Sequence, residues 1–323
     1  MCNTFVVKAK NGDKIVGSDM QYGNMVGDKT GRYPKGIVLN GFTSSIEFDA
    51  FFSDFNIAGK HVRTVSMGYS AHLVARTQWF RDTSFYNSLV TKDDQVSGLS
   101  LLQFILGNAK TIDETKKLLD GKQLTLPVEI LNQFGTVQIF LYDIAKDKSI
   151  VINFVEKDGK KGIAKYTDLS GHVITNMPDA EYHIKNLGAF VNYADSVESV
   201  TKVKEINGYP VEFTGFGNAW KGIPSSATPE DRFISLNLHL DVAIKHYQPK
   251  DSKEALLLVS KVLEKHTVIE GTVCHTTVTG KSWDKTQWLV MINLKTNITY
   301  RKMCDSFNYE IVEFPPIDIK NTV

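Results

Sequence analysis

The residue with the clearest chemical potential in this sequence is Cys2, which follows directly after Met1. The small side chain at position 2 permits removal of Met1, and Cys2 would then carry a thiol and a free α-amine on one residue. An α-amine has a reference pKa of about 7.7–8.0, so it can take the thiol proton near neutral pH. A deprotonated thiol is a strong nucleophile. Cys2 therefore predicts a nucleophile and its general base in one residue, with a chance cysteine at a frayed terminus as the alternative.

Other arrangements that could do chemistry are weaker. Cys274 and His275 are adjacent, and neighbours on a strand point to opposite faces, so we do not expect them to act as a pair. The eight histidines have no HExxH spacing, which argues against a zinc site. The segment 215–217 is too short for a dinucleotide fingerprint, and no phosphate-binding GxxxxGK[ST] motif occurs. We expect neither a metal nor a cofactor.

The elements around Cys2 must hold the terminus in place. Residues 4–9 read as a strand that begins almost at the terminus, and residues 14–17 continue as a second strand after a turn at Asn11-Gly12. A terminus held in a sheet is ordered, and a catalytic terminus must be ordered.

Further along the chain, strands and helices come in separate runs. Strands are expected at 36–42, 137–144, 149–155, 287–293 and 298–302. Helices are expected at 99–106, from Thr111 to Gly121, from the cap Thr228 toward Tyr247, and after the cap Ser252. Because a helix does not follow each strand, a doubly wound parallel sheet is disfavoured. The order predicts antiparallel hairpins covered by helix pairs, in one domain of layered α and β structure.

Composition excludes several classes of protein. Of 323 residues, 42% are hydrophobic and 23% charged, which is typical of a globular chain rather than a disordered one. A net charge of +1 disfavours nucleic acid as a partner. No apolar run reaches the ~18 residues of a membrane span, and no secretory signal is visible. Three cysteines do not form a disulfide framework, so a cytoplasmic location is expected.

Three features occur in a characteristic order: Cys2 before a strand, the segment Val173-Ile174-Thr175-Asn176-Met177-Pro178, and the segment from Gly222 to Phe233. Together they resemble the choloylglycine hydrolase family of linear amide C–N hydrolases, which includes bile salt hydrolases and penicillin V acylases. The resemblance implies the N-terminal nucleophile hydrolase fold, an α+β four-layer αββα sandwich of two antiparallel sheets, as a single domain over residues 1–323. It also implies a homo-oligomer, with a tetramer as the family tendency.

The same resemblance assigns roles to residues. Cys2 corresponds to the nucleophile and base, and Asn176 to the asparagine beside the reacting carbonyl. Arg232 corresponds to the arginine near the thiol. Trp79 falls where the family carries an oxyanion-side asparagine or an aromatic residue, and Met20 is expected with it at the substrate.

Two positions depart from the family motif G-R-N-x-D that follows the first hairpin. Here the segment 17–22 reads G-S-D-M-Q-Y. Ser18 replaces the arginine, so it cannot supply a positive charge to favour the thiolate. Gln21 replaces the aspartate that holds the α-amine, and a local shift would let Asp19 take the acidic role.

The resemblance implies a cofactor-free hydrolase that cleaves a small-molecule linear amide through a thioester on Cys2. N-acyl amino acids, bile salt conjugates, penicillin V and acyl homoserine lactones are the substrate types considered. Two alternatives remain: a weak or inactive relative that binds an acyl ligand, and an acyltransferase that passes the thioester to an amine.

Overall fold

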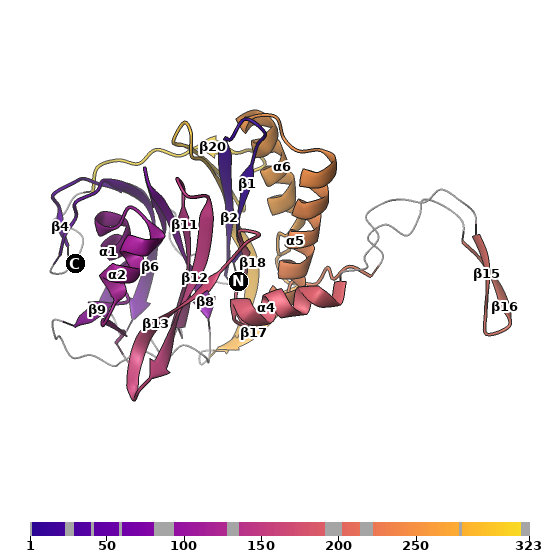
Figure 1. Cartoon of the computed structure of the whole chain (residues 1–323), viewed down its shortest axis with the longest axis horizontal. Coiled ribbons are helices and arrows are strands. Elements are labelled where there is room, and N and C mark those ends of the chain that lie inside the picture. Colours follow the sequence, from indigo (N-terminus) through magenta and orange to yellow (C-terminus); the bar gives the residue numbers. More distant parts are fainter. Residues whose placement is uncertain are drawn as a thin grey trace.

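The computed structural model describes residues 2–22, 29–39, 42–57, 60–80, 94–127, 136–190, 202–213, 222–277 and 280–317. Within these residues, two seven-stranded sheets pack face to face and helices cover their outer faces (Figure 1). All strand pairs within these two sheets are antiparallel.

Sheet A contains the N-terminal hairpin. Its strand order is β14-β1-β2-β18-β19-β20, with β17 also paired to β18. The bounds are β1 Thr4–Lys8, β2 Lys14–Tyr22, β14 Val173–Ile174, β17 Val273–Thr277, β18 Gly280–Asn293, β19 Ile298–Met303 and β20 Glu310–Ile311. Both neighbours of β1 run antiparallel to it. The C-terminal end of β2 and the segment that follows β14 therefore lie beside the N-terminus.

Sheet B has the strand order β13-β12-β11-β8-β7-β6-β3. The bounds are β3 Thr30–Tyr33, β6 Phe48–Ile57, β7 Lys60–Ser70, β8 Leu73–Phe80, β11 Thr136–Asp143, β12 Lys148–Lys157 and β13 Lys160–Asp168. Three short pairs stand outside the two sheets: β4 Val38–Leu39 with β5 Phe42–Thr43, β9 Gln95–Ser97 with β10 Gln123–Thr125, and β15 Lys202–Ile206 with β16 Tyr209–Phe213. The last hairpin projects away from the sandwich in Figure 1.

Helices cover both outer faces. The helices are α1 Leu101–Asn108, α2 Ile112–Leu119, α4 Ala180–Leu187, the 3-10 turn η1 Gly188–Phe190, α5 Pro229–His246 and α6 Ser252–Lys265. Helix α1 packs on β7 and β8, whereas α6 packs on β1, β2 and β18 with α5 beside it (Figure 1). The layers therefore run α1–α2, sheet B, sheet A, α5–α6, which confirms the expected α+β αββα sandwich.

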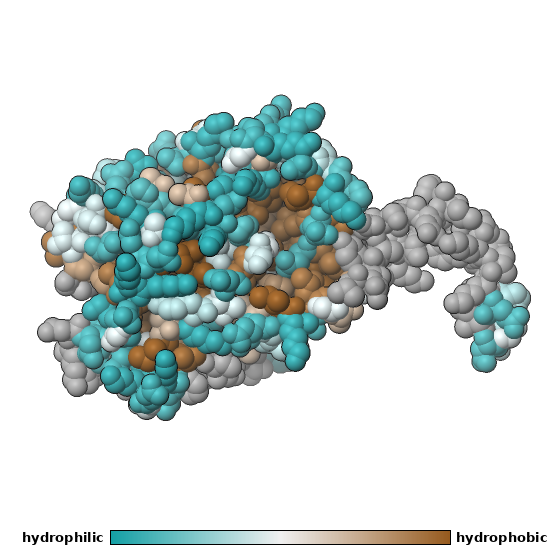
Figure 2. All heavy atoms as spheres, in the orientation of Figure 1, coloured by the Kyte–Doolittle hydropathy of each residue, from teal (hydrophilic) through white to brown (hydrophobic). Residues whose placement is uncertain are grey.

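The core follows the alternation of strand side chains. On β8, Val74 joins the cluster between the sheets, whereas Leu73 and Ala75 join the cluster under α1 and α2. The first cluster continues on the other face of sheet A under α6, with Ala255 and Val259. In Figure 2 hydrophilic residues cover most of the visible face, and hydrophobic ones gather mainly in its middle, between β12 and α5.

Most of the expected local elements are confirmed, and two are wrong in detail. Thr111 and Thr228 cap their helices through side-chain oxygens, as the sequence predicts. The third cap is Asp251 rather than Ser252, because the Asp251 carboxylate accepts from two backbone N–H groups of the first turn. The strand expected at 36–42 is also wrong, since Gly36 has φ of +88° in a turn and only the short strands β4 and β5 follow.

Candidate functional site

Cys2 is buried where the two sheets meet, and only 4% of its surface is exposed. Its backbone nitrogen donates to Oδ1 of Asn176 at 2.5 Å, and its Sγ lies 3.8 Å from Sδ of Met20. The predicted nucleophile is thus held by β2 on one side and by the segment after β14 on the other. The structure brings Cys2 together with Asn176 and Met20, and the roles expected for these residues at the substrate stay predictions.

Asn176 holds the terminus through its amide oxygen. Oδ1 accepts from the nitrogen of Cys2 and from Nη2 of Arg232 at 3.1 Å, while Nδ2 donates to the carbonyl of Trp79 at 2.8 Å. Two donors on one side and a carbonyl on the other fix which end of the amide is oxygen. In this structure the amide nitrogen of Asn176 is therefore bound to Trp79, and the role of Asn176 as an oxyanion donor stays a prediction.

His183 on α4 is hydrogen-bonded to the backbone carbonyl of Asn176. The sequence interpretation gave His183 no role. Its Nε2 lies 2.8 Å from the carbonyl of Asn176, and its ring stacks on Phe233 at 4.7 Å between centroids. Burial lowers the pKa of His183, so the ring is neutral and Nε2–H is the donor. His183 thereby fixes the backbone on which the Asn176 amide stands.

Arg232 reaches the residue pair 2–3 from the first turn of α5. Its Nη1 donates to the carbonyl of Cys2 at 3.1 Å and to Oδ1 of Asn3. The same Asn3 donates from Nδ2 to Asp19 Oδ2 at 2.6 Å, and from its backbone N–H to Asp19 Oδ1 at 2.6 Å. Asn3 thus bridges a buried cation and a buried carboxylate.

The two buried charges stabilise each other across that bridge. Burial raises the pKa of Asp19, and the positive charge of Arg232 opposes this shift. Burial lowers the pKa of Arg232, and the negative charge of Asp19 is the largest opposing cause. Both side chains lie on the helix-facing side of sheet A, where water is excluded. Arg232 lies in the first turn of α5, where the helix dipole disfavours a positive charge. Its interaction with Asp19 explains why a cation is found there.

Gln21 lies two residues along β2 from Asp19 and on the same face. Its Nε2 donates to Asp19 Oδ2 at 3.0 Å and to the carbonyl of His266 at 2.9 Å. Asp19 takes a position beside the terminus by holding the N–H of Asn3, the residue after the nucleophile. The roles expected for Gln21 and Asp19 in holding the α-amine stay predictions.

Arg76 is a second residue of the site to which the sequence interpretation gave no role. It lies in the middle of β8 in sheet B, is fully buried, and places Nη2 3.4 Å from Sγ of Cys2. The available signal was an arginine within the apolar, alternating segment 73–80, where a fully buried cation is uncommon. Its contact with Cys2 depends on the packing of one sheet on the other, which the segment alone does not reveal.

A polar ladder seats the terminus between the sheets. The hydroxyls of Thr4 and Ser18 lie 3.1 Å apart, and Ser18 also donates to the carbonyl of Asn3 at 3.0 Å. From sheet B, Gln78 donates to Thr4 Oγ1 at 3.3 Å, and Gln138 donates to Gln78 at 3.1 Å. These bonds satisfy buried polar groups. Ser18 therefore has a structural role, whereas the family motif carries a charged arginine at this position.

Trp79 contacts the site through its backbone carbonyl. Arg76 and Gln78 point between the sheets, so alternation places the Trp79 side chain on the opposite face of β8, where it is 37% exposed. Its role at the substrate stays a prediction. By residue type, other aromatic residues between positions 51 and 86 are also candidates for lining an acyl pocket. Of these, Phe51, Phe52 and Phe80 belong to the core, whereas the Phe55 side chain, Phe85 and Tyr86 lie outside the described parts.

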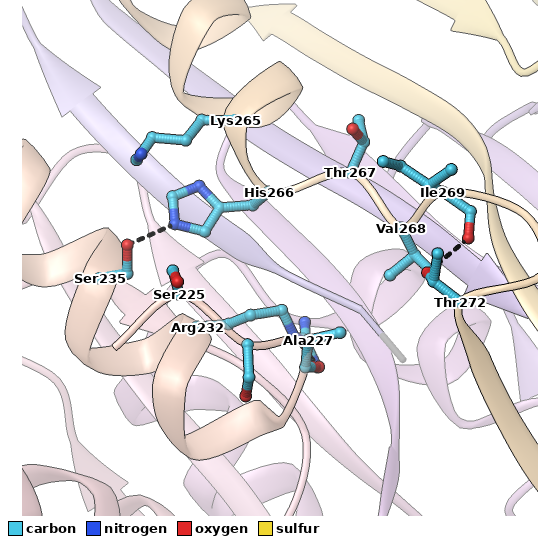
Figure 3. Close-up of a pocket in the computed structure, with 11 residues that line it drawn as sticks. Ser225, Ala227, Arg232, Ser235, Lys265, His266, Thr267, Val268, Ile269 and Thr272 are labelled. Carbon is cyan, nitrogen blue, oxygen red and sulfur yellow. Dashed lines mark hydrogen bonds between the residues drawn. The ribbon is translucent and has the colours of Figure 1, made fainter. Parts of the chain in front are cut away.

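A pocket of about 210 Å³ lies behind Arg232, at the ends of α5 and α6 (Figure 3). Hydroxyl groups and His266 line it, and His266 Nε2 lies 3.0 Å from Ser235 Oγ. Arg232 therefore belongs both to this pocket and to the hydrogen-bond network of Cys2.

Neither a metal cluster nor a membrane-spanning helix occurs in the part of the chain that the structure describes. Within it, no group of three or more His, Cys, Asp or Glu side chains is arranged to hold a metal ion. The helices found there are all too short or too polar to cross a bilayer.

Comparisons with known proteins agree with this geometry. The family described as linear amide C-N hydrolases, choloylglycine hydrolase family, matches residues 2–320. A conjugated bile acid hydrolase of Lactobacillus gasseri is 24% identical over 239 residues, which cover 74% of this chain and 66% of that protein. A bile salt hydrolase/transferase of Clostridium perfringens is 27% identical over 202 residues, or 62% of this chain and 57% of that protein. The aligned segments thus span somewhat less than two thirds of these relatives.

Solved structures match over most of the fold. A mutant conjugated bile acid hydrolase from Clostridium perfringens has a TM-score of 0.79 at 19% identity, covering 97% of this chain and 92% of that one. Penicillin V acylase from Agrobacterium tumefaciens has a TM-score of 0.70 at 18% identity, covering 99% and 87%. These likenesses establish the shared fold.

Proposed function

Because this chain belongs to the choloylglycine hydrolase family of linear amide C–N hydrolases, we propose that it hydrolyses the amide bond between an acyl group and an amine or amino acid, with Cys2 as nucleophile. The observation that carries the proposal is the burial of the Cys2 nitrogen and thiol in one site. There Asn176 accepts from the nitrogen, Met20 contacts the thiol, and Arg232 donates to the carbonyl of Cys2.

The reaction uses the two groups of Cys2 in turn. With Met1 removed, the α-amine takes the thiol proton, and the thiolate attacks the amide carbon to form a C–S bond and a tetrahedral oxyanion. Collapse of this intermediate breaks the C–N bond, and the α-ammonium gives its proton to the leaving nitrogen. Water, deprotonated by the α-amine, then attacks the thioester, which releases the carboxylic acid and restores the thiol.

The surrounding residues position these groups. Asn176 accepts from the nitrogen of Cys2, which orients that nitrogen near the thiol. Arg232 binds the carbonyl of Cys2 and the Asn176 amide, so it fixes both in one rigid unit. Such positioning matters because the reacting atoms must be held within a fraction of an ångström of their productive geometry.

The family and the names of the relatives support a choice of substrate class. The names of the relatives refer to conjugated bile acids, bile salts and penicillin V. We propose small-molecule amides of this kind, with N-acyl amino acids and acyl homoserine lactones as the other classes to examine.

The test is amine release from a panel of these four amide classes by protein whose N-terminal residue has been established by intact mass. We expect at least one class to be hydrolysed by protein that begins at Cys2. The Cys2→Ala variant and protein that retains Met1 should both lose this activity, the second because its α-amine is absent from Cys2. Equal turnover by Cys2→Ala would refute the assignment.

A transferase activity is the second candidate, because one relative is named a bile salt hydrolase/transferase. The same thioester would then be attacked by an amine in place of water. Adding an amino acid to the hydrolysis assay distinguishes the two, since a transferase forms a new amide. A non-catalytic relative would instead bind an acyl ligand, seen as a raised melting temperature, without amine release.

Three further predictions stay open to measurement. These are a single N-terminal nucleophile hydrolase domain over residues 1–323, a homo-oligomer with a tetramer expected, and a cytoplasmic location.

A further inference from the structure

We propose that Arg76 is a catalytic residue that stabilises the thiolate of Cys2, supplying from sheet B the positive charge that Ser18 lacks. This inference rests on the proposed function, because it assigns a role within the same site. It concerns the thiol itself, so it can be tested on the reactivity of Cys2 without any amide substrate.

The geometry places Arg76 directly against the sulfur. Nη2 of Arg76 lies 3.4 Å from Sγ of Cys2, and also donates to the carbonyl of Asp19 at 3.1 Å. Nη1 donates to the carbonyl of Ser66 at 2.8 Å. The guanidinium lies over the Trp288 ring, 5.1 Å from its centroid. Contacts with both sheets therefore fix the cation beside the nucleophile.

The contacts of Arg76 leave its charge without a carboxylate partner. Among the described residues its polar partners are two carbonyl oxygens and two sulfur atoms, those of Cys2 and Met20. A buried cation is costly unless it is paired. The thiolate is the anion that this position can pair with, because carbonyls and an indole ring carry only partial charge.

The guanidinium keeps this orientation at a cost in hydrogen bonding. Its Nε is buried and has no hydrogen-bond partner within the described residues. Buried donors without partners are rare and call for an explanation. Contact of Nη2 with the sulfur of Cys2 explains why the guanidinium keeps an orientation that leaves Nε without a partner among the described residues.

Other charged groups near Cys2 face a different side. Asp19 and Arg232 meet across Asn3 on the helix-facing side of sheet A, where they compensate each other. The negative charges of Cys2, Glu230 on α5 and Asp284 on β18 also raise the pKa of Arg232, in that order, so Arg232 is a second cation that acts on the thiolate without contacting Sγ. His183 is neutral and bonds to the Asn176 carbonyl. In the described part of the chain, Arg76 is the cation in contact with Sγ.

Ser18 and Arg76 fit together sterically. Ser18 and Met20 are two apart on β2, so both side chains point between the sheets, where Met20 contacts the sulfur of Cys2 and Arg76. Ser18 is fully buried beneath Thr4. An arginine at position 18 would have to extend between the sheets, where Arg76 already places a buried cation. A small residue at 18 therefore permits the cation to arrive from position 76.

The test measures alkylation of Cys2 by iodoacetamide as a function of pH, on protein that begins at Cys2. Cys274 and Cys304 are exposed and will also react, so the product is read on the N-terminal peptide by mass spectrometry. We expect Arg76→Met to raise the midpoint pH of the reaction by about 1–3 units, since an opposite charge at this range shifts a titration by that amount. Arg76→Lys keeps the charge and should shift it by less than half as much.

Two further variants make the test specific. The double variant Ser18→Arg with Arg76→Met should lower the midpoint again relative to Arg76→Met, because it returns a cation to the same space. Arg63→Met is the matched control: Arg63 also lies over an aromatic ring, but it is paired with Asp54 and does not contact Cys2. It should leave the midpoint unchanged.

The outcomes separate this inference from the proposed function. A folded Arg76→Met protein with an unchanged midpoint would overturn the role of Arg76, and so would an Arg76→Lys protein as strongly shifted as Arg76→Met. If Arg76→Met does not fold, Arg76→Gln removes the charge but keeps donors for the carbonyls of Ser66 and Asp19, and it takes the place of Arg76→Met in each comparison. If the midpoints shift as expected but no amide is hydrolysed, the thiolate role stands and the proposed hydrolase function fails.

Discussion

Replacing Asn3 with alanine tests whether the buried charges beside the nucleophile depend on a neutral bridge. Asn3 is fully buried, and its side chain accepts from Arg232 and donates to Asp19 at 2.6 Å. A hydrogen bond to a charged group contributes about 1.5–3 kcal/mol to stability. Loss of both bonds should therefore lower the free energy of unfolding by about 3–6 kcal/mol.

Asn153 on β12 offers a matched control. It is also a buried asparagine in a sheet, but its Nδ2 bonds to the neutral Gln138 at 3.4 Å. Asn153→Ala should cost about 1 kcal/mol for that bond, and both variants leave a cavity of similar size. The assay is guanidinium denaturation at neutral pH followed by tryptophan fluorescence. If the two variants lose the same free energy to within about 1 kcal/mol, the bridge between the charges is not a main source of stability.

Three further changes test other parts of the fold. Thr228→Ala removes the N-cap of α5 and should cost about 1 kcal/mol, measured by chemical denaturation. Burial lowers the pKa of His266 to about 4. The free energy of unfolding should therefore fall by up to about 3 kcal/mol as the pH drops from about 6.5 to 4, while above pH 6.5 the contribution of His266 stays constant. His266→Gln should flatten this slope. Gly17→Ala would bring a methyl group within 2.8 Å of Val259 on α6 and should lower the melting temperature, whereas Gly188→Ala, with open space around it, should not.

Much of the architecture follows from local signals. The N-terminal hairpin, the hairpin of β11 and β12, and the two long helices are fixed by alternation, turn residues and caps that act within a few positions. The family resemblance, carried by Cys2 and the segments around Asn176 and Arg232, predicts the layers. The error at Ser252 is of the local kind, since Asp251 is an equally good cap and lies one residue earlier.

The site is predictable only where a motif marks it. Cys2, Asn176 and Arg232 lie in segments whose spacing is characteristic, and the structure brings them together. Arg76 and His183 lie in unmarked segments. Their contacts arise from the packing of sheet B on sheet A and of α4 beneath the Asn176 segment, which depends on the whole fold.

The most direct measurement of the central claim is the capture of the acyl-enzyme. A substrate that is hydrolysed should be mixed with the protein, quenched in acid within a turnover, and the N-terminal peptide analysed by mass spectrometry. We predict that the peptide beginning at Cys2, kept at acid pH so that the acyl group does not migrate from sulfur to the α-amine, carries the mass of the acyl group. Turnover without any acyl group on that peptide, or with the acyl group on another residue, would contradict the account.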